Sequence, residues 1–185
     1  FFSTHRSRTP YFRQIPDEFV QFLQNEWTSP EGYPPYLLAL AHYEWIELVL
    51  SVSSRSVERA VDAGGDLLDG TPVLNPVLAS LRYDWPVHRI APRRKVRPAE
   101  TYLLVFRDHA DAVQFSEINA FTARLLTLLE TGTLSGRAAL ETIAIESRHP
   151  DPSLIFQAGG ALLDDLHGRG AILGAGRDAK RDQAL

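Results

Sequence analysis

The stretch from Thr101 to Leu173 constrains the fold of this chain more than any other part. It opens with an apolar run of strand-favouring residues, and a short polar loop separates this run from a second apolar segment. Three segments with helical spacing of apolar residues follow, and an apolar triplet ends the stretch. The predicted order is strand (101–107), loop (108–112), strand (113–115), three helices, and strand (171–173). This order predicts an α+β fold with a winged-helix-like module, in which a short antiparallel sheet is joined to three helices.

Local signals set the boundaries of these predicted elements. Four apolar residues in succession, Leu103 to Phe106, predict a strand that is covered on both faces. Ser116 is the predicted N-cap of the first helix, residues 117–130, and Ser135 is the predicted N-cap of the second. Asp151 and Pro152 are predicted to begin the third helix, which ends near Gly168.

The whole chain divides into four regions. Residues 1–65 predict a helical region that packs on the module, with helices over 17–27 and 36–50, and residues 66–100 predict a connector with an extended strand over 77–87. Residues 101–174 make up the winged-helix-like module, and the tail 175–185 is predicted to be disordered. Because the sequence begins with Phe1 and not with Met, we expect the helical region to be the remainder of a larger N-terminal domain.

Several kinds of catalytic and metal site are excluded by what the sequence lacks. The chain has no cysteine, so it cannot form disulfides, thiolate nucleophiles or cysteine metal sites. It contains no glycine-rich phosphate loop, no HExxH motif and no Gly-x-Ser-x-Gly elbow, and its six histidines are scattered. We therefore predict a chain that is not an enzyme by itself and that holds no metal and no cofactor. No apolar run is long enough to span a membrane, so we expect a cytoplasmic protein without membrane contact.

Charge distinguishes the two functions that a winged-helix-like module commonly serves, DNA binding and peptide binding. Residues 117–173 contain seven acidic and four basic residues, and the whole chain carries a net charge of −4. Phosphates repel such a surface, so nucleic acid is disfavoured as a ligand. We interpret the densest basic run, Arg93 to Arg97, as an exposed loop. The sequence favours a peptide that adds as a strand to a sheet edge, and a DNA-binding transcriptional regulator remains the alternative.

The predicted peptide site combines the sheet edge with the third helix. An added strand needs backbone donors and acceptors along the edge and apolar side chains beside it. The edge is expected to involve the segments 102–106, 113–115 and 171–173, and the sequence leaves open which of them is exposed. The predicted peptide-binding residues are Tyr102, Leu104, Phe106, Val113, Phe115, Ile155, Leu162 and Ile172.

The N-terminal segment is a second candidate contact surface. Residues 1–14 are basic and aromatic, and Pro10 and Pro16 break any helix there. The segment is either a connector with solvated arginines or a contact surface for an acidic partner or peptide. The predicted partner-contact residues are His5, Arg6, Arg8, Tyr11, Phe12 and Arg13.

Two runs of the sequence carry a resemblance to a known family. The first is Pro-Tyr-Phe-Arg-Gln-Ile-Pro-Asp-Glu-Phe over 10–19, and the second is Tyr-Pro-Pro-Tyr-Leu-Leu-Ala-Leu-Ala-His-Tyr-Glu-Trp over 33–45. Over roughly residues 1–173 the chain resembles the bacterial HvfC-type family, whose members are often described as DNA-binding domain proteins. Residues 101–173 also resemble, more weakly, the PqqD-like leader-recognition fold, which is a winged-helix relative.

This resemblance implies a role in the maturation of ribosomally made peptides. Members of the family act as partners of a TIM-barrel multinuclear non-haem iron enzyme, which holds the iron and performs the oxidative chemistry. By this resemblance, the chain would bind the leader of a precursor peptide and help to present its core to that enzyme. No catalytic residue can be carried over from the family to a position of this sequence.

Overall fold

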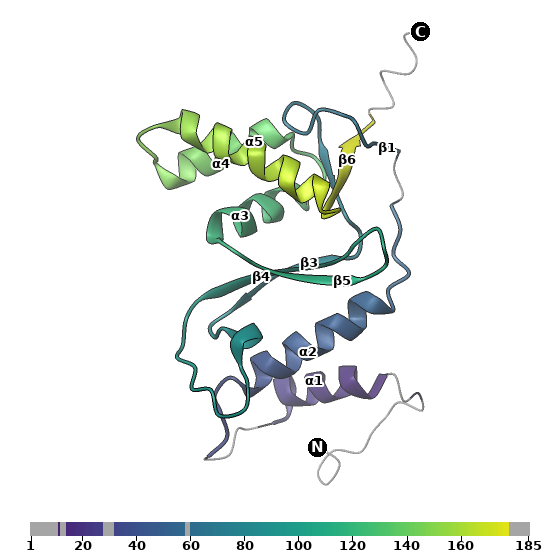
Figure 1. The fold of residues 1–185 in the computed structure, drawn as a ribbon, viewed down its shortest axis with the longest axis vertical. Coiled ribbons are helices and arrows are strands. Elements are labelled where there is room, and N and C mark those ends of the chain that lie inside the picture. The colour runs from purple at the N-terminus through teal and green to yellow at the C-terminus, as the bar shows by residue number, and fades with distance from the viewer. Residues whose placement is uncertain (1–10, 12–13, 28–31, 58–59, 178–185) are drawn as a thin grey trace. The chain divides into compact units, whose positions relative to one another are not determined.

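The computed structural model describes residues 11, 14–27, 32–57 and 60–177, and Figure 1 shows its helices and strands. Both kinds of element are present, so the predicted α+β class is confirmed. Contacts divide the chain into two compact units, Phe1–Val52 with Tyr83–Thr101 (unit 1) and Ser53–Arg82 with Tyr102–Leu185 (unit 2). The segment 66–100, predicted as a connector, is thus shared between the two units, because most of its strand residues belong to unit 2 and its 3₁₀ helix belongs to unit 1.

Unit 1 is built on two helices, α1 (Ile15–Asn25) and α2 (Leu37–Ser51). Pro16 lies at the start of α1 and two acidic residues lie in its first turn, where they favour the positive end of the helix dipole. Helix α2 carries apolar residues around most of its circumference, which is typical of a helix contacted on several sides. It packs against α1 and against the 3₁₀ helix η2 (Val87–Arg89). Both helices were predicted, with bounds that differ by one or two residues.

The extended strand predicted over 77–87 is shorter in the structure. Strand β3 covers Leu78–Tyr83, and the chain then turns into η2. Pro86 has no backbone N–H, so it cannot donate the hydrogen bond that a longer strand would need. It is instead the N-cap residue of η2. Trp85, which lies within the predicted strand, follows β3 in the structure and packs edge-on against Tyr36, with the ring centroids 5.4 Å apart.

The described residues form two small sheets. One has the strand order β3-β4-β5, with β4 (Thr101–Arg107) in the middle and β5 (Val113–Ile118) antiparallel beside it. The other has the order β1-β6-β2, with β1 (Val61–Asp62) and β2 (Pro72–Leu74) both antiparallel to β6 (Ile172–Gly176). Four successive residues of β4, Leu103 to Phe106, are buried, as their uninterrupted apolar character predicted.

The position of β6 corrects the prediction of one continuous sheet edge. This strand was expected beside the segments 102–106 and 113–115, but it pairs with β1 and β2 instead. Gly170 has a positive φ of 84°, which turns the chain after helix α5 (Pro152–Gly168). The backbone N–H of Asn75 donates to the carbonyl of Ala171 at 2.9 Å. Gly174 has a φ of +143°, and a Cβ there would overlap the carbonyl oxygen of Asp62 in β1. Strand β6 also runs to Gly176, so residues 175 and 176 do not belong to a disordered tail.

The boundary between β5 and the first helix of the module was also predicted wrongly. Residues up to Ile118 belong to β5, and α3 covers Ala120–Leu129. The N-cap is therefore Asn119 rather than Ser116, and its side chain accepts a hydrogen bond from the Thr122 amide at 2.8 Å. Ile118 continues the strand because it pairs with Tyr102 of β4, and its half-buried side chain packs against the helical core.

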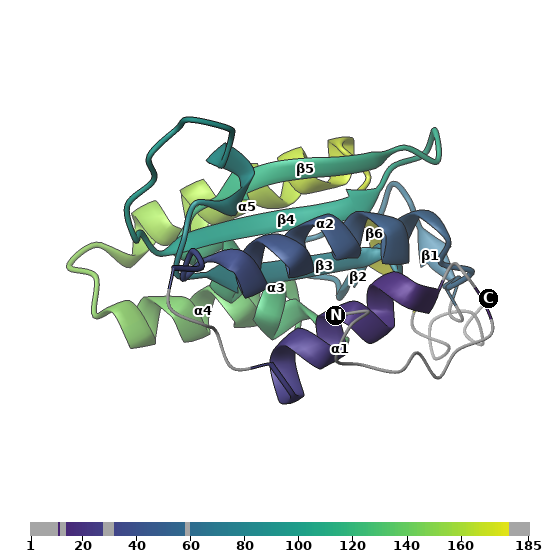
Figure 2. The same ribbon diagram turned by 90° about the horizontal axis from the view of Figure 1, so that it is seen from below.

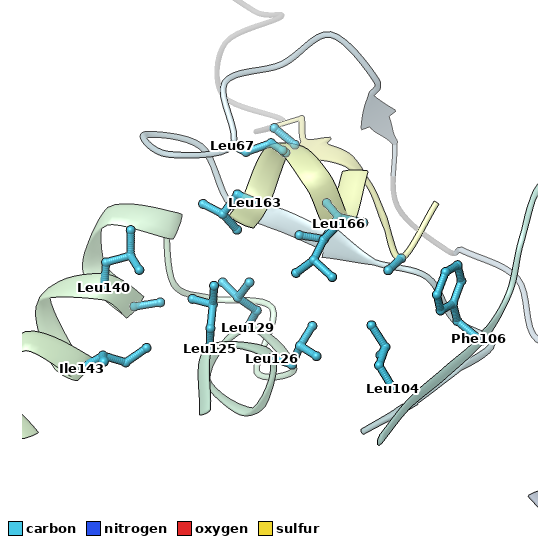
Figure 3. Packing of buried hydrophobic residues seen from close by; sticks show 14 of the residues in the cluster. Leu67, Leu104, Phe106, Leu125, Leu126, Leu129, Leu140, Ile143, Leu163 and Leu166 are labelled. Atoms are coloured by element: carbon cyan, nitrogen blue, oxygen red, sulfur yellow. The ribbon is translucent and has the colours of Figure 1, made fainter. Parts of the chain in front are cut away.

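Three helices complete unit 2, and they bury one core with the apolar side chains of β4 and β6 (Figure 3). Helix α4 (Gly136–Ser147) begins at the predicted cap Ser135, and α5 (Pro152–Gly168) begins at the predicted cap Asp151. Each fully buried leucine contributes about 1.5–3 kcal/mol to folding. Labelled members of the core in Figure 3 are Leu67, Leu104, Phe106, Leu125, Leu126, Leu129, Leu140, Ile143, Leu163 and Leu166. Within the described residues, no helix is long and apolar enough to cross a membrane.

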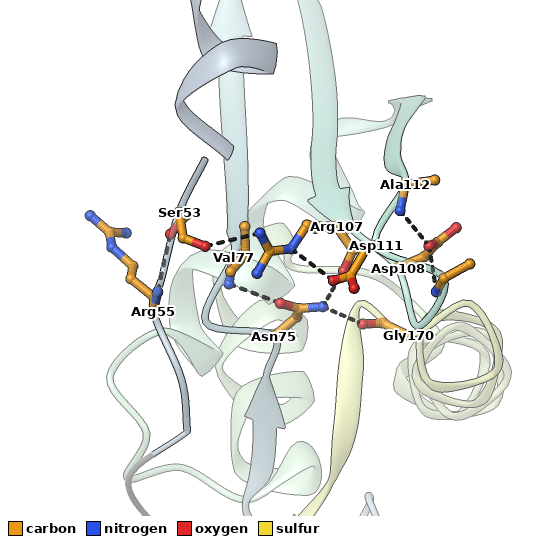
Figure 4. A network of polar contacts seen from close by, with 10 residues as sticks. Ser53, Arg55, Asn75, Val77, Arg107, Asp108, Asp111, Ala112 and Gly170 are labelled. Atoms are coloured by element: carbon orange, nitrogen blue, oxygen red, sulfur yellow. Dashed lines mark hydrogen bonds and ion pairs between the residues drawn. The ribbon is translucent and has the colours of Figure 1, made fainter. Parts of the chain in front are cut away.

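One asparagine connects both sheets of unit 2. The Asn75 side-chain amide donates to the carbonyls of Arg107, at 2.8 Å, and Gly170, at 2.9 Å. Its side-chain oxygen accepts from the Val77 amide at 2.8 Å. Asn75 therefore fixes the turn between β2 and β3 to the end of β4 and to the corner before β6 (Figure 4). Since Arg107 ends β4 and Gly170 follows α5, these bonds join the end of β4 to the end of α5. They thereby also position β5, which pairs with β4, relative to α5.

Candidate functional site

Strand β5 is an edge strand of the sheet β3-β4-β5. It pairs with β4 along its whole length, from Tyr102 opposite Ile118 to Arg107 opposite Val113. No other described strand pairs with its outer side. The edge strands of the other sheet, β1 and β2, have only two and three residues. The opposite edge strand, β3, continues into unit 1 at Tyr83. Among the described strands, β5 is therefore the longest edge strand that lies within one compact unit.

The end of α5 lies against β5. Arg169, the C-cap residue of α5, donates a hydrogen bond from its guanidinium group to the hydroxyl of Ser116 on β5. The guanidinium carbon lies 5.8 Å from the centroid of the Phe106 ring, which allows a cation–π interaction. Figure 2, which is turned from the first view, shows α5 behind the sheet near β5. A sheet edge and the end of a helix therefore meet at Arg169.

The hairpin loop before β5 is fixed by Asp108. Its carboxylate accepts hydrogen bonds from the backbone amides of Ala112, at 3.0 Å, and Ala110, at 2.8 Å. Gln114 on β5 donates to the same carboxylate at 2.6 Å. These bonds lower the pKa of Asp108, with the amide of Ala112 as the main cause. A charged Asp108 thus holds the start of β5 in one conformation.

The predicted peptide-binding residues fall into two groups. Val113 and Phe115 lie on the edge strand β5 and are half-buried, as are Tyr102 on β4 and Leu162 on α5. The other four are core residues: Leu104 and Phe106 on the central strand β4, Ile155 on α5, and Ile172 on the central strand of the other sheet. The structure therefore does not bring all eight residues to one edge, because β4 and β6 are central strands.

Two residues at this edge, Ser116 and Arg169, were not among the predicted site residues. Ser116 was predicted to be the N-cap of the first helix of the module, and not a residue of the strand. Arg169 lies just after the third predicted helix, and no sequence pattern connects it with the sheet. A single basic residue near the end of a helix does not by itself indicate a binding site. The fold shows that the Arg169 side chain reaches β5.

Unit 1 contains a second candidate surface, an apolar groove between its two helices. The groove has a volume of about 420 Å³. It starts at Pro16, and its walls are side chains of α1 and α2 with one carboxylate, Glu44, among them. The lining residues are Pro16, Phe19, Val20, Leu37, Leu40, Ala41, Glu44, Trp45 and Leu48. Of the predicted partner-contact residues, Tyr11 is described and is 59% exposed; His5, Arg6, Arg8, Phe12 and Arg13 lie outside the described residues.

The titratable groups of the described residues do not assemble a metal site. No group of three or more His, Cys, Asp or Glu residues there could hold a metal ion. His42 of α2 forms a 2.8 Å hydrogen bond with the hydroxyl of Tyr83, and burial lowers the pKa of His42. Burial also raises the pKa of the Tyr83 hydroxyl well above its usual range. The two side chains form a part-buried hydrogen bond, which indicates a structural role.

These features define an α+β domain with a sheet edge beside a helix end. Comparison with known families agrees with the resemblance seen in the sequence: residues 75–167 match the model of the HvfC C-terminal domain. The match begins at Asn75 and covers half of the chain, so the chain belongs to the HvfC-type family. No curated protein matches the chain.

Proposed function

We propose that this chain is a non-catalytic partner protein that binds the leader of a precursor peptide and a modifying enzyme in ribosomal peptide maturation. The observation that carries the proposal is the edge strand β5 with the end of α5 against it. A sheet edge binds an extended peptide through backbone hydrogen bonds and selects its side chains with the residues beside it. Membership of the HvfC-type family supports the same role.

The peptide would add to β5 as a fourth strand of the sheet β3-β4-β5. Six residues of β5 give a length that is typical of strands in sheets. Val113 and Phe115 lie on this strand, so they remain in the proposed site. The buried residues Leu104, Phe106 and Ile155 support the strand and the helix from the core, and Ile172 holds the neighbouring sheet.

The enzyme partner would be a TIM-barrel multinuclear non-haem iron enzyme, as the family resemblance implies. The iron would belong to that enzyme, and this chain would contribute no cofactor. The proposed contact surface for the enzyme is the segment 1–13 together with the apolar groove that starts at Pro16. Because ribosomal precursors are synthesised in the cytoplasm, the complex would assemble there.

Co-purification tests the proposal directly. The chain, the iron enzyme encoded beside its gene and the precursor encoded there are produced together, with an affinity tag on this chain alone. We expect the enzyme and the precursor to co-purify with the chain, and the precursor to be lost when its leader is deleted. If neither protein is retained on the tagged chain, the proposal is wrong.

A further inference from the structure

We infer that Arg169 selects a peptide that carries a carboxylate next to the edge of β5, two residues away from an apolar side chain. This inference rests on the proposed function, because it names the peptide chemistry that the same edge would accept. It depends on the partners of Arg169, on the face of β5 that Ser116 occupies, and on the side chains that flank Ser116 on that face.

Arg169 is held in place but retains capacity to bind an anion. Its side chain is 38% exposed, and its only acidic partner among the described residues is Asp165, at 3.4 Å. By contrast, Arg124 binds Glu146 with two hydrogen bonds of 2.8 and 2.6 Å. A guanidinium group has five N–H donors, so the contacts of Arg169 with Ser116 and Asp165 leave donors for a further carboxylate. Such a carboxylate can form the bidentate pair that arginine favours.

The register of the sheet indicates where this carboxylate would sit. Ser116 lies opposite Leu104, and directly opposed residues share one face of a sheet. Leu104 belongs to the core under the helices, so Ser116 is on the helical face, where it meets Arg169. A peptide residue placed opposite Ser116 on an added strand has its Cβ about 5 Å from that of Ser116. Its side chain therefore reaches the guanidinium group of Arg169.

The next position on the same face favours an apolar residue. Ile118, two residues after Ser116, is half-buried and packs against the core of unit 2. A peptide residue opposite Ile118 extends this apolar surface, and side chains on one face of a strand recur every second residue. The selected peptide thus has an apolar residue and an acidic residue separated by one position.

A peptide-display selection on the full chain tests this inference without knowledge of the natural peptide. A library of random peptides is selected on the wild-type chain and on the charge-reversal variant Arg169→Glu. Wild type should enrich Asp or Glu two positions from an apolar residue, and Arg169→Glu should enrich Lys or Arg there. The control variant Arg94→Glu makes the same change of net charge in an exposed loop of unit 1, and it should select the same peptides as wild type.

A second, more conservative variant, Arg169→Gln, keeps the inference testable if Arg169→Glu does not fold. Arg169→Gln should weaken binding of a selected acidic peptide about tenfold and leave binding of its Asn or Gln analogue unchanged. If peptides are enriched but the acidic position is absent, or if Arg169→Glu selects the same peptides as wild type, the inference is wrong and the proposed function stands. If no peptide is enriched on the wild-type chain, both the inference and the proposed function are contradicted.

Discussion

Asn75 donates a hydrogen bond of 2.9 Å to the carbonyl oxygen of Gly170, which lies 95 residues further along the chain. The same amide group donates to Arg107, so one side chain joins the end of β4 to the end of α5. Strand β5 follows β4, and Arg169 precedes Gly170, so this asparagine also sets the geometry of the proposed peptide site. The family match starts at this residue.

Replacement Asn75→Ala removes all three side-chain hydrogen bonds and leaves a part-buried amide and two carbonyls without these partners. We expect the free energy of unfolding of unit 2 to fall by about 2–4 kcal/mol, since each lost partner of a buried group costs about 1–3 kcal/mol. Urea unfolding measures this loss. The control is Asn25→Ala, where one exposed hydrogen bond to Gln21 is lost. Equal stability of the two variants would show that the Asn75 network contributes little.

Two glycines of unit 2 should respond in opposite directions to replacement by alanine. Gly174→Ala places a Cβ against the carbonyl oxygen of Asp62 at a φ of +143°, so we expect a loss of about 2 kcal/mol. Gly160→Ala lies within α5 and meets open space, so it should stabilise by about 0.5–1 kcal/mol. Thermal unfolding of both variants measures the difference. A neutral Gly174→Ala would contradict the close approach of β1 to β6.

His42 should make the stability of unit 1 depend on pH. Burial lowers the pKa of His42 below 6.5, the value expected for the unfolded chain. Between these two pKa values the unfolded chain binds more protons, so stability is complete above pH 6.5 and falls as the pH drops to the folded pKa. His42→Gln should reduce this loss, measured by urea unfolding at about pH 7.5 and pH 5.5.

Tyr83→Phe is the control for this pH dependence. It removes the hydroxyl that bonds His42 but keeps the burial that lowers the pKa. We expect it to lose about 1 kcal/mol at both pH values and to retain the wild-type pH dependence. An unchanged pH dependence in His42→Gln would mean that His42 is not the responsible group.

Most of the fold could be predicted from local signals in the sequence. The caps Ser135 and Asp151, the helix α2 and the buried strand β4 follow from short-range patterns, and the structure has them within one residue of the predicted positions. The pairing of β6 could not be predicted, because it depends on Asn75 and on the conformations of Gly170 and Gly174, which are set by contacts between distant segments. For the same reason the sequence placed Leu104 and Ile172 on one edge, although both lie on central strands.

Duplex DNA should not bind to the chain. The recognition helix of the alternative function would be α5, whose exposed residues Asp164 and Asp165 repel phosphate. The basic residues Arg93, Arg94, Lys95 and Arg97 lie in an exposed loop of unit 1, outside the helices. A gel shift at low salt, where electrostatic attraction is strongest, should therefore show no complex. A complex that Asp164→Lys strengthens and Arg94→Glu weakens would instead favour the DNA-binding alternative.

Residue-resolved amide exchange of the full chain, with and without the precursor peptide, tests strand addition at β5 most directly. The peptide should slow exchange of alternate amides in Val113–Ile118, because only every second amide of an antiparallel edge strand faces outward. Exchange in β3, the opposite edge strand, should be unchanged. Protection of β3 with no change in β5, or binding of the peptide without protection of either strand, would contradict the site proposed for this protein.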